Sequence, residues 1–146
     1  MLKVLDLKFI EYEAEREIEI SKALEFISYQ VSHGEMDAYA LRFLLGNKIV
    51  SYSGDSGVCE GIRKASLNSE IFLCEAAINI NDNENNTKAH LSYFLAGEIA
   101  KKSNVGKLVL VHHSGKDSDE IMVQEVKKSG FSGDIEIAKD LDTFAI

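Results

Sequence analysis

Residues 38–57 read AYALRFLLGNKIVSYSGDSG, and this stretch decides the fold class. Two runs rich in apolar residues flank Gly46-Asn47, and Gly and Asn both accept the positive φ angles of a tight turn. The stretch therefore predicts a β-hairpin made of Ala38–Leu45 and Lys48–Ser53. The hairpin ends in Gly54-Asp55-Ser56-Gly57, a cluster of turn-forming residues.

Upstream of the hairpin, apolar and polar residues alternate in Val4–Tyr12 and in Leu24–Val31, which predicts two more strands. Downstream of it, apolar residues recur at spacings of three and four, which is typical of a short amphipathic helix beginning near Val58. Helices and strands then alternate; the predicted segments are strand 71–76, helix 90–102, strand 107–111, helix 119–128, strand 134–138 and a short edge strand 143–146.

These segments predict one α/β (α+β) domain over residues 1–146, with a β meander in 1–53 and alternating helices and strands in 54–146. We expect one mixed β-sheet with helices mainly on one face. Strands 71–76 and 107–111 are nevertheless apolar at consecutive positions, as strands buried on both faces are. Three helices cannot cover both faces of such a sheet, so we expect something else to cover the second face.

The composition limits the classes of protein to which this chain can belong. The chain has 146 residues, enough for one domain, and 45% of them are apolar, enough for a core. Its formal net charge of −8 opposes non-specific binding to nucleic acid, which depends on phosphate neutralisation. We expect the two cysteines to be reduced thiols in a cytoplasmic protein, because there is no C-x-x-C pair, signal peptide or long apolar run.

Three potential metal ligands each follow a predicted strand: His33, Asp55 and His112. Ligand sites in open α/β sheets lie beyond the carboxyl ends of strands, so we expect these side chains to converge. Imidazole and carboxylate are ligands that Zn²⁺ prefers. A fourth residue, His90, lies at the start of a predicted helix, where the helix dipole disfavours its charged form. The alternative is structural: an isolated His often packs at a strand end, and an Asp after Gly often forms a turn.

The spacing of these residues adds a resemblance to a known family. The segments VSHGEMDAYALRF (31–43), YSGDSG (52–57), HLS (90–92) and LVLVH (108–112) resemble the second half of metallo-β-lactamase superfamily hydrolases. The branch most similar in pattern is the ribonuclease Z-like one. The resemblance covers most of the chain from about Phe26 onward, and the combination of segments is more specific than any single segment.

The resemblance implies a role for each candidate residue. His33 matches the third-motif histidine of the family, Asp55 the carboxylate that bridges two metal ions, and His112 the last histidine ligand. His90 matches a histidine used for proton transfer or phosphate contact, while His113 is expected to have no role at the metal. The family fold and activity imply two zinc ions that activate water against an ester or phosphodiester, because a bridging carboxylate suits two Zn²⁺ ions.

The chain also departs from the family, because it contains only four histidines and no H-x-H-x-D-H motif. It therefore resembles a carboxyl-terminal half of the αββα sandwich, and the absent half would cover the second face of the sheet. We expect the isolated chain to be inactive or incomplete. Two alternatives stay open: an inactive half-domain that self-associates into a homodimer, and one subunit of a split hydrolase whose complementary chain carries the missing motif.

Overall fold

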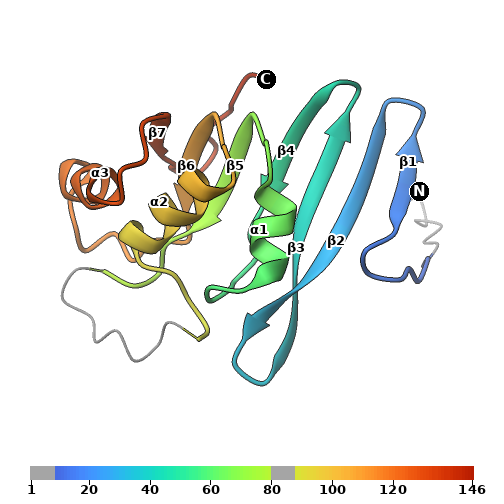
Figure 1. Ribbon diagram of the computed structural model, residues 1–146, viewed down its shortest axis with the longest axis horizontal. Helices are drawn as coiled ribbons and strands as arrows, with labels where there is room; N and C mark the ends of the chain where they lie inside the picture. The colour runs from blue at the N-terminus through green and yellow to red at the C-terminus, as the bar shows by residue number, and fades with distance from the viewer. Residues whose placement is uncertain (1–8, 80–87) are drawn as a thin grey trace, which may run out of the picture.

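The computed structural model describes residues 9–79 and 88–146, which form a seven-stranded mixed sheet with three helices (Figure 1). The strands are β1 (Glu17–Ser21), β2 (Leu24–His33), β3 (Met36–Leu45), β4 (Lys48–Tyr52), β5 (Ile71–Glu75), β6 (Lys107–Val111) and β7 (Asp134–Ile137). The helices are α1 (Glu60–Ser66), α2 (Tyr93–Lys102) and α3 (Asp119–Lys128). The strands lie in the sheet in chain order, antiparallel from β1 to β4 and parallel from β4 to β7.

The hairpin predicted from residues 38–53 is confirmed. Strands β3 and β4 pair in antiparallel register from Leu41↔Tyr52 to Leu45↔Lys48, and Gly46 in the turn has a φ of 63°. The meander also contains β1, which pairs with β2 and was not predicted. The α/β class and the single mixed sheet agree with the sequence prediction.

All three helices lie on one face of the sheet, as predicted (Figure 1). Helix α1 packs on β2, β3 and β4, α2 packs on β5 and β6, and α3 contacts α2 and β7. The side chains of Ser92 and Ser118 cap the amino ends of α2 and α3 by accepting hydrogen bonds from backbone N–H groups. Between helices and sheet lies the core, which includes the fully buried Ile62, Phe72 and Leu110.

The second face of the sheet carries apolar side chains that no helix covers. Residues paired across strands point to the same face, so Phe43, Val50 and their neighbours point away from the helices. On this face the side chains over β5 and β6 are buried, as Val109 shows, whereas Tyr39 is 41% exposed and Tyr52 is 37% exposed. The expected lack of cover is therefore found over β3 and β4.

Four details of the prediction need correction. Residues 9–12 are not a strand, and residues 4–8 of that predicted strand lie outside the described residues. Residues 143–146 form no strand. Helix α1 begins at Glu60, because Cys59 is its N-cap, so Val58 lies before the helix; its side chain is exposed. Helix α2 begins at Tyr93 rather than near residue 90, because the capping serine at position 92 sets its first turn.

None of the helices in the described part of the chain combines the length and apolar character needed to cross a lipid bilayer.

We predict that Gly54→Ala destabilises the fold strongly. Gly54 has a φ of 60°, and a Cβ there would lie 2.6 Å from the carbonyl oxygen of Tyr39. Backbone strain and this clash together should lower the free energy of unfolding by roughly 3 kcal/mol in urea titrations. Gly46→Ala is the matched control, because Gly46 has a φ of 63° but no atom within 4 Å of the added Cβ. The control should lose only about 1 kcal/mol; equal losses would contradict the role of the clash.

Candidate metal centre

The candidate residues gather because the strands that carry them run in one direction. Strands β2, β4, β5 and β6 are mutually parallel in direction, so their carboxyl ends meet at one edge of the sheet. His33 is the last residue of β2, Asp55 lies three residues after β4, and His112 directly follows β6. We call this edge, with His33, Asp55, Glu75, His90 and His112, the rim.

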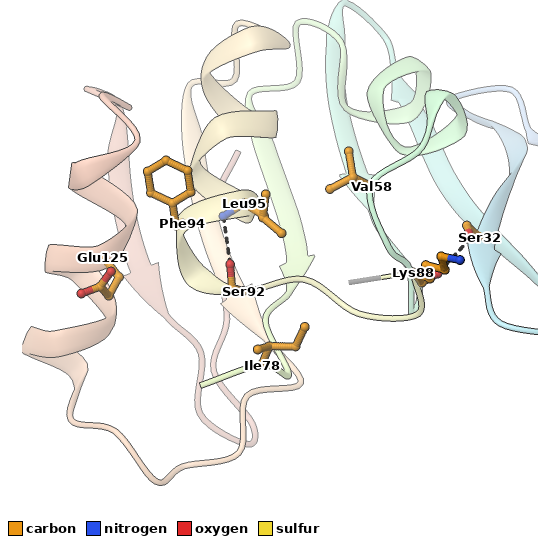
Figure 2. Close-up of a pocket in the computed structure, with 8 residues that line it drawn as sticks. All are labelled: Ser32, Val58, Ile78, Lys88, Ser92, Phe94, Leu95 and Glu125. Atoms are coloured by element: carbon orange, nitrogen blue, oxygen red, sulfur yellow. Dashed lines mark hydrogen bonds between the residues drawn. The ribbon is translucent and has the colours of Figure 1, made fainter. Parts of the chain in front are cut away.

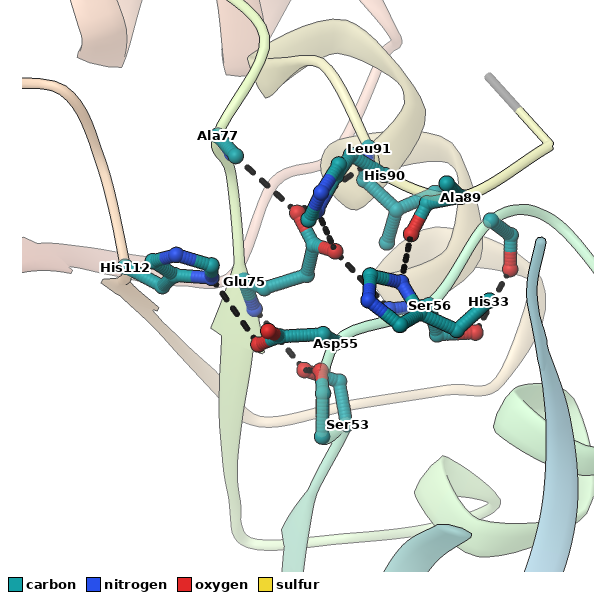
Figure 3. A network of polar contacts seen from close by, with 12 residues as sticks. His33, Ser53, Asp55, Ser56, Glu75, Ala77, Ala89, His90, Leu91 and His112 are labelled. Atoms are coloured by element: carbon teal, nitrogen blue, oxygen red, sulfur yellow. Dashed lines mark hydrogen bonds and ion pairs between the residues drawn. The ribbon is translucent and has the colours of Figure 1, made fainter. Parts of the chain in front are cut away.

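The structure brings all four predicted site residues together at the rim (Figure 3). The rings of His33 and His90 meet edge to face with centroids 4.9 Å apart, and those of His90 and His112 with centroids 5.6 Å apart. The Oδ1 atom of Asp55 lies 2.9 Å from Nδ1 of His112. Residues far apart in the sequence therefore form one cluster.

Each rim histidine has its Nδ1 atom engaged by an acceptor. His33 donates to the carbonyl oxygen of Ala89 at 2.8 Å and His90 to Oε1 of Glu75 at 2.9 Å, while Nδ1 of His112 lies 2.9 Å from Oδ1 of Asp55. In the neutral imidazole the lone pair then lies on Nε2. Metal-binding histidines typically have their second nitrogen bonded to a carboxylate or carbonyl in this way, so the donor set fits a metal ion.

Glu75 organises the rim, and the sequence analysis did not identify it. Its carboxylate is 0% exposed and accepts four hydrogen bonds. Oε1 accepts from the backbone N–H of Ser56 and from His90, and Oε2 accepts from the backbone N–H groups of Ala77 and Leu91 (Figure 3). One sequence feature could have identified Glu75: it is the single acidic residue at the end of the apolar strand IFLCE.

One group of side chains within the described residues has ligand atoms that all lie within 4.8 Å of one another: Glu75, His90 and His112. The Glu75 carboxylate has about four lone-pair sites, and its four donors already use them. Glu75 is therefore better suited to orient His90 than to bind a metal. The carboxylate of Asp55 is more exposed, and within the described residues its close polar contact is with Nδ1 of His112, so Asp55 is the more available ligand.

Burial and negative charge around the rim shift two nearby pKa values. Burial raises the pKa of the Tyr52 phenol, and the carboxylates of Asp55 and Glu75 raise it further. Burial also raises the pKa of the Cys74 thiol well above its ordinary value, with a smaller contribution from Glu75. Cys74 is thus an unreactive core residue.

His90 and His113 differ from each other in their surroundings. His90 lies three residues before the first residue of α2, so it is not at the helix start where the helix dipole was expected to disfavour its charged form. Its close polar partner is instead the carboxylate of Glu75. The Nε2 atom of His113 donates to the carbonyl oxygen of Ala138 at 3.2 Å. That His113 has no role at a metal stays a prediction.

Two cavities lie near the rim. One, of about 710 Å³, borders His112 directly and is also lined by Lys139 and Asp140. The other, of about 610 Å³, lies beside the start of α2 and is lined by Lys88 and Phe94 (Figure 2). None of the described residues that line the second cavity is a candidate ligand. Of these two cavities, both lined by described residues, the first is the one that borders a candidate ligand.

Comparison with known proteins yields relatives by sequence, although no family model matches the chain. An uncharacterized protein of Mycobacterium leprae is 31% identical over 126 residues, which are 85% of this chain and 43% of that protein. Ribonuclease Z of Streptomyces avermitilis is 28% identical over 82% of this chain and 36% of its own length. The probable metallo-hydrolase YhfI of Bacillus subtilis is 28% identical over 69% of this chain and 41% of its own length.

Solved structures identify the fold. The metallo-β-lactamase fold protein YhfI of Bacillus subtilis superposes with a TM-score of 0.80 at 24% identity, over 90% of this chain and 53% of YhfI. This chain has the metallo-β-lactamase fold. Human tRNase Z, short form, superposes with a TM-score of 0.67 at 16% identity, over 89% of this chain and 45% of that enzyme.

Sequence and structure together relate the chain to the ribonuclease Z-like metallo-hydrolases, which confirms the resemblance described above. The relation to metallo-hydrolases implies a site for metal ions, usually zinc. The chain spans about half or less of the length of the curated relatives it matches, between 36% and 43% in the three described. The metallo-β-lactamase fold is thus present here over about half of its usual extent.

We predict that Glu75→Gln destabilises the protein and releases His90. A neutral amide presents N–H groups to donors, so the free energy of unfolding should fall by roughly 3 kcal/mol. By ¹⁵N NMR, His90 should lose its Nδ1–H tautomer. Glu70→Gln is the control, because the exposed Glu70 carboxylate accepts a hydrogen bond from the backbone N–H of Ile49. The control should lose less than about 1 kcal/mol; an unchanged His90 tautomer in Glu75→Gln would contradict the orienting role.

Proposed function

We propose that this chain supplies part of the dinuclear zinc centre of a metal-dependent hydrolase that cleaves an ester or phosphodiester. The observation that supports this most is the rim, where an exposed carboxylate and three histidines from separate segments meet, with ring centroids 4.9 and 5.6 Å apart along the row. Imidazole and carboxylate are the ligand types of catalytic zinc.

His33, Asp55 and His112 are the proposed ligands. The Nε2 atom of His33 carries the available lone pair, because Nδ1 of that ring donates to the carbonyl oxygen of Ala89. The Nδ1 atom of His112 lies 2.9 Å from Oδ1 of Asp55, which leaves Nε2 of His112 and the second oxygen of Asp55 as the available ligand atoms. When bound, the zinc ions would supply a hydroxide near neutral pH and polarise the bond to be cleaved.

His90 is the proposed proton donor to the leaving group. Its Nδ1–H bond to Oε1 of Glu75 orients the ring and leaves Nε2 to hold and release a proton. The buried carboxylate of Glu75, 2.9 Å from Nδ1, fixes the orientation of the ring during that transfer. Direct contact of Nε2 with a phosphate oxygen is the alternative role, and the same orientation serves both.

The proposed ligand set is incomplete within this chain. Two histidines and one carboxylate are too few for two zinc ions, which typically take at least three protein ligands each. The metallo-hydrolase relatives are more than twice as long as the region they share with this chain. We therefore propose that the remaining ligands come from polypeptide outside one copy of these 146 residues, and that a single isolated chain is a poor catalyst.

Ribonuclease Z among the relatives favours a phosphodiester substrate over other esters. Lys139 in the cavity beside His112 offers a cation for a phosphate group. The net charge of −8 disfavours a long nucleic acid and favours a small phosphodiester. The two free cysteines support the proposal that the protein works in the cytoplasm.

We predict that Asp55→Ala lowers the zinc retained after dialysis to background, because it removes the bridging carboxylate. His113→Ala should leave zinc retention unchanged, since the ring bonds the carbonyl oxygen of Ala138 instead. Zinc is measured per chain by mass spectrometry. Equal losses in the two variants would contradict the ligand assignment.

We predict that His90→Ala separates metal binding from catalysis. The variant should retain zinc as the unmodified chain does, while zinc-dependent cleavage of bis(p-nitrophenyl) phosphate falls by about 100-fold, as expected for loss of a general acid. Loss of zinc equal to that in Asp55→Ala would show that His90 is a ligand. Equal rates of cleavage by His90→Ala and by the unmodified chain would contradict the proposed role of His90 as proton donor.

A further inference from the structure

We propose that Tyr93 and Asp117 are positioning residues, and that the hydrogen bond between them holds the segment that carries His112 against the segment that carries His90. The hydroxyl of Tyr93 donates to Oδ2 of Asp117 at 3.1 Å. Tyr93 lies three residues after His90 in the chain, and Asp117 lies five residues after His112. The inference rests on the proposed function, because it identifies what sets the spacing between a proposed zinc ligand and the proposed proton donor.

Tyr93 is the fixed end of this hydrogen bond. It is the first residue of α2, is 1% exposed and belongs to the core between the helices and the sheet. Helix α2 packs on β5, β6 and α3, so the elements around it hold it on several sides. Protein interiors are close-packed, and a buried tyrosine ring therefore keeps one orientation and presents its hydroxyl at a defined point.

Residues 112–118 link β6 to α3 and form the less constrained end of the hydrogen bond. They contain no helix or strand, and residues 114–116 are exposed. A Cβ added at Gly115 would meet no heavy atom within 4 Å, so Gly115 faces open space. A segment with so little packing takes its course from the groups that anchor its ends. Asp117 is such an anchor, because it lies directly before Ser118, the N-cap of α3.

The backbone of His112 makes this anchor important for the rim. His112 has a φ of 50°, in the left-handed region that disfavours residues with a Cβ. Such a conformation persists only where the surrounding structure enforces it. Before His112, the carbonyl oxygen of Val111 accepts a hydrogen bond from the backbone N–H of Ala76 at 3.0 Å. After His112, the bond from Tyr93 to Asp117 limits how far the segment can relax.

Two contacts of the His112 ring depend on this restraint. Its Nδ1 atom lies 2.9 Å from Oδ1 of Asp55, and its centroid lies 5.6 Å from that of His90 (Figure 3). A metal site needs its ligands held to within about 0.5 Å of the productive geometry. Removing an outer-shell group that orients a ligand typically weakens metal binding by roughly 10- to 100-fold. The bond from Tyr93 to Asp117 acts through the backbone of the segment, so we expect an effect at the lower end of that range.

The first test measures the spacing of the two histidine rings in the zinc-free chain, by the nuclear Overhauser effect between ring protons of His90 and His112. Tyr93→Phe removes the hydroxyl and keeps the buried ring, and the signal between the two histidine rings should be lost. Tyr29→Phe is the matched control, because Tyr29 also packs against the core but lies beside α1, with Nζ of Lys64 6.0 Å from its ring centroid. The control should keep the signal between the histidine rings; an unchanged signal in Tyr93→Phe would overturn the proposal.

The second test measures the zinc dissociation constant by competition with a chelator. Tyr93→Phe should raise this constant about 10-fold, whereas Tyr29→Phe should leave it unchanged. The double variant Tyr93→Phe/Asp117→Ala should bind zinc as weakly as Asp117→Ala alone, because both changes remove the same hydrogen bond. Losses that add in the double variant would overturn the proposal, as would an equal loss of zinc affinity in Tyr29→Phe.

Failure of this inference is distinguishable from failure of the proposed function. If the unmodified chain binds no zinc, the hydrolase proposal fails, and the signal between the rings of His90 and His112 alone decides whether Tyr93 and Asp117 position His112. If the unmodified chain binds zinc and Tyr93→Phe binds it equally well, the positioning role fails and the proposed function stands.

Discussion

The buried carboxylate of Glu75 is the interaction on which the rim depends. It terminates β5 inside the protein and binds backbone N–H groups from the segment after β4, from its own strand exit and from the segment before α2, as well as the ring of His90. A buried charge is tolerated only when its hydrogen-bonding capacity is satisfied, and here it is satisfied by three separate segments. The same requirement that stabilises the charge therefore holds together the loops that carry Asp55 and His90.

The arrangement separates two roles that acidic residues play in a metal site. Glu75 is buried, saturated with donors and suited to orient an imidazole, whereas Asp55 is partly exposed and, within the described residues, lies against His112. All three helices lie on one face of the sheet, and this placement leaves the rim beside the other face. The rim lies at the border of an apolar surface that none of the described helices covers, so whatever covers that surface also lies near the candidate ligands.

Much of the architecture could be predicted because short stretches of sequence determine its turns, strands and helix ends. The Gly46-Asn47 turn, the apolar run of β6 and the capped helix α3 were each predicted to within about a residue, since turn chemistry and periodicity act over short distances. The convergence of His33, Asp55 and His112 followed from a general rule about carboxyl ends of strands. Strand β1 was not predicted although its sequence EIEIS alternates charged and apolar residues; its pairing with β2 is what defines it as a strand.

The sequence by itself determined the α/β class, most of the strands and helices and the placing of His33, Asp55 and His112 after strands, because periodicity, turn residues and motif spacing are properties of the chain. Only the tertiary structure revealed that Glu75 organises the rim and that α2 begins at Tyr93, three residues after His90. The reason is physical: a glutamate at the end of an apolar strand looks like any solvent-exposed acid until the packing of distant segments buries it. Burial and the donors that compensate it are decided by the fold as a whole.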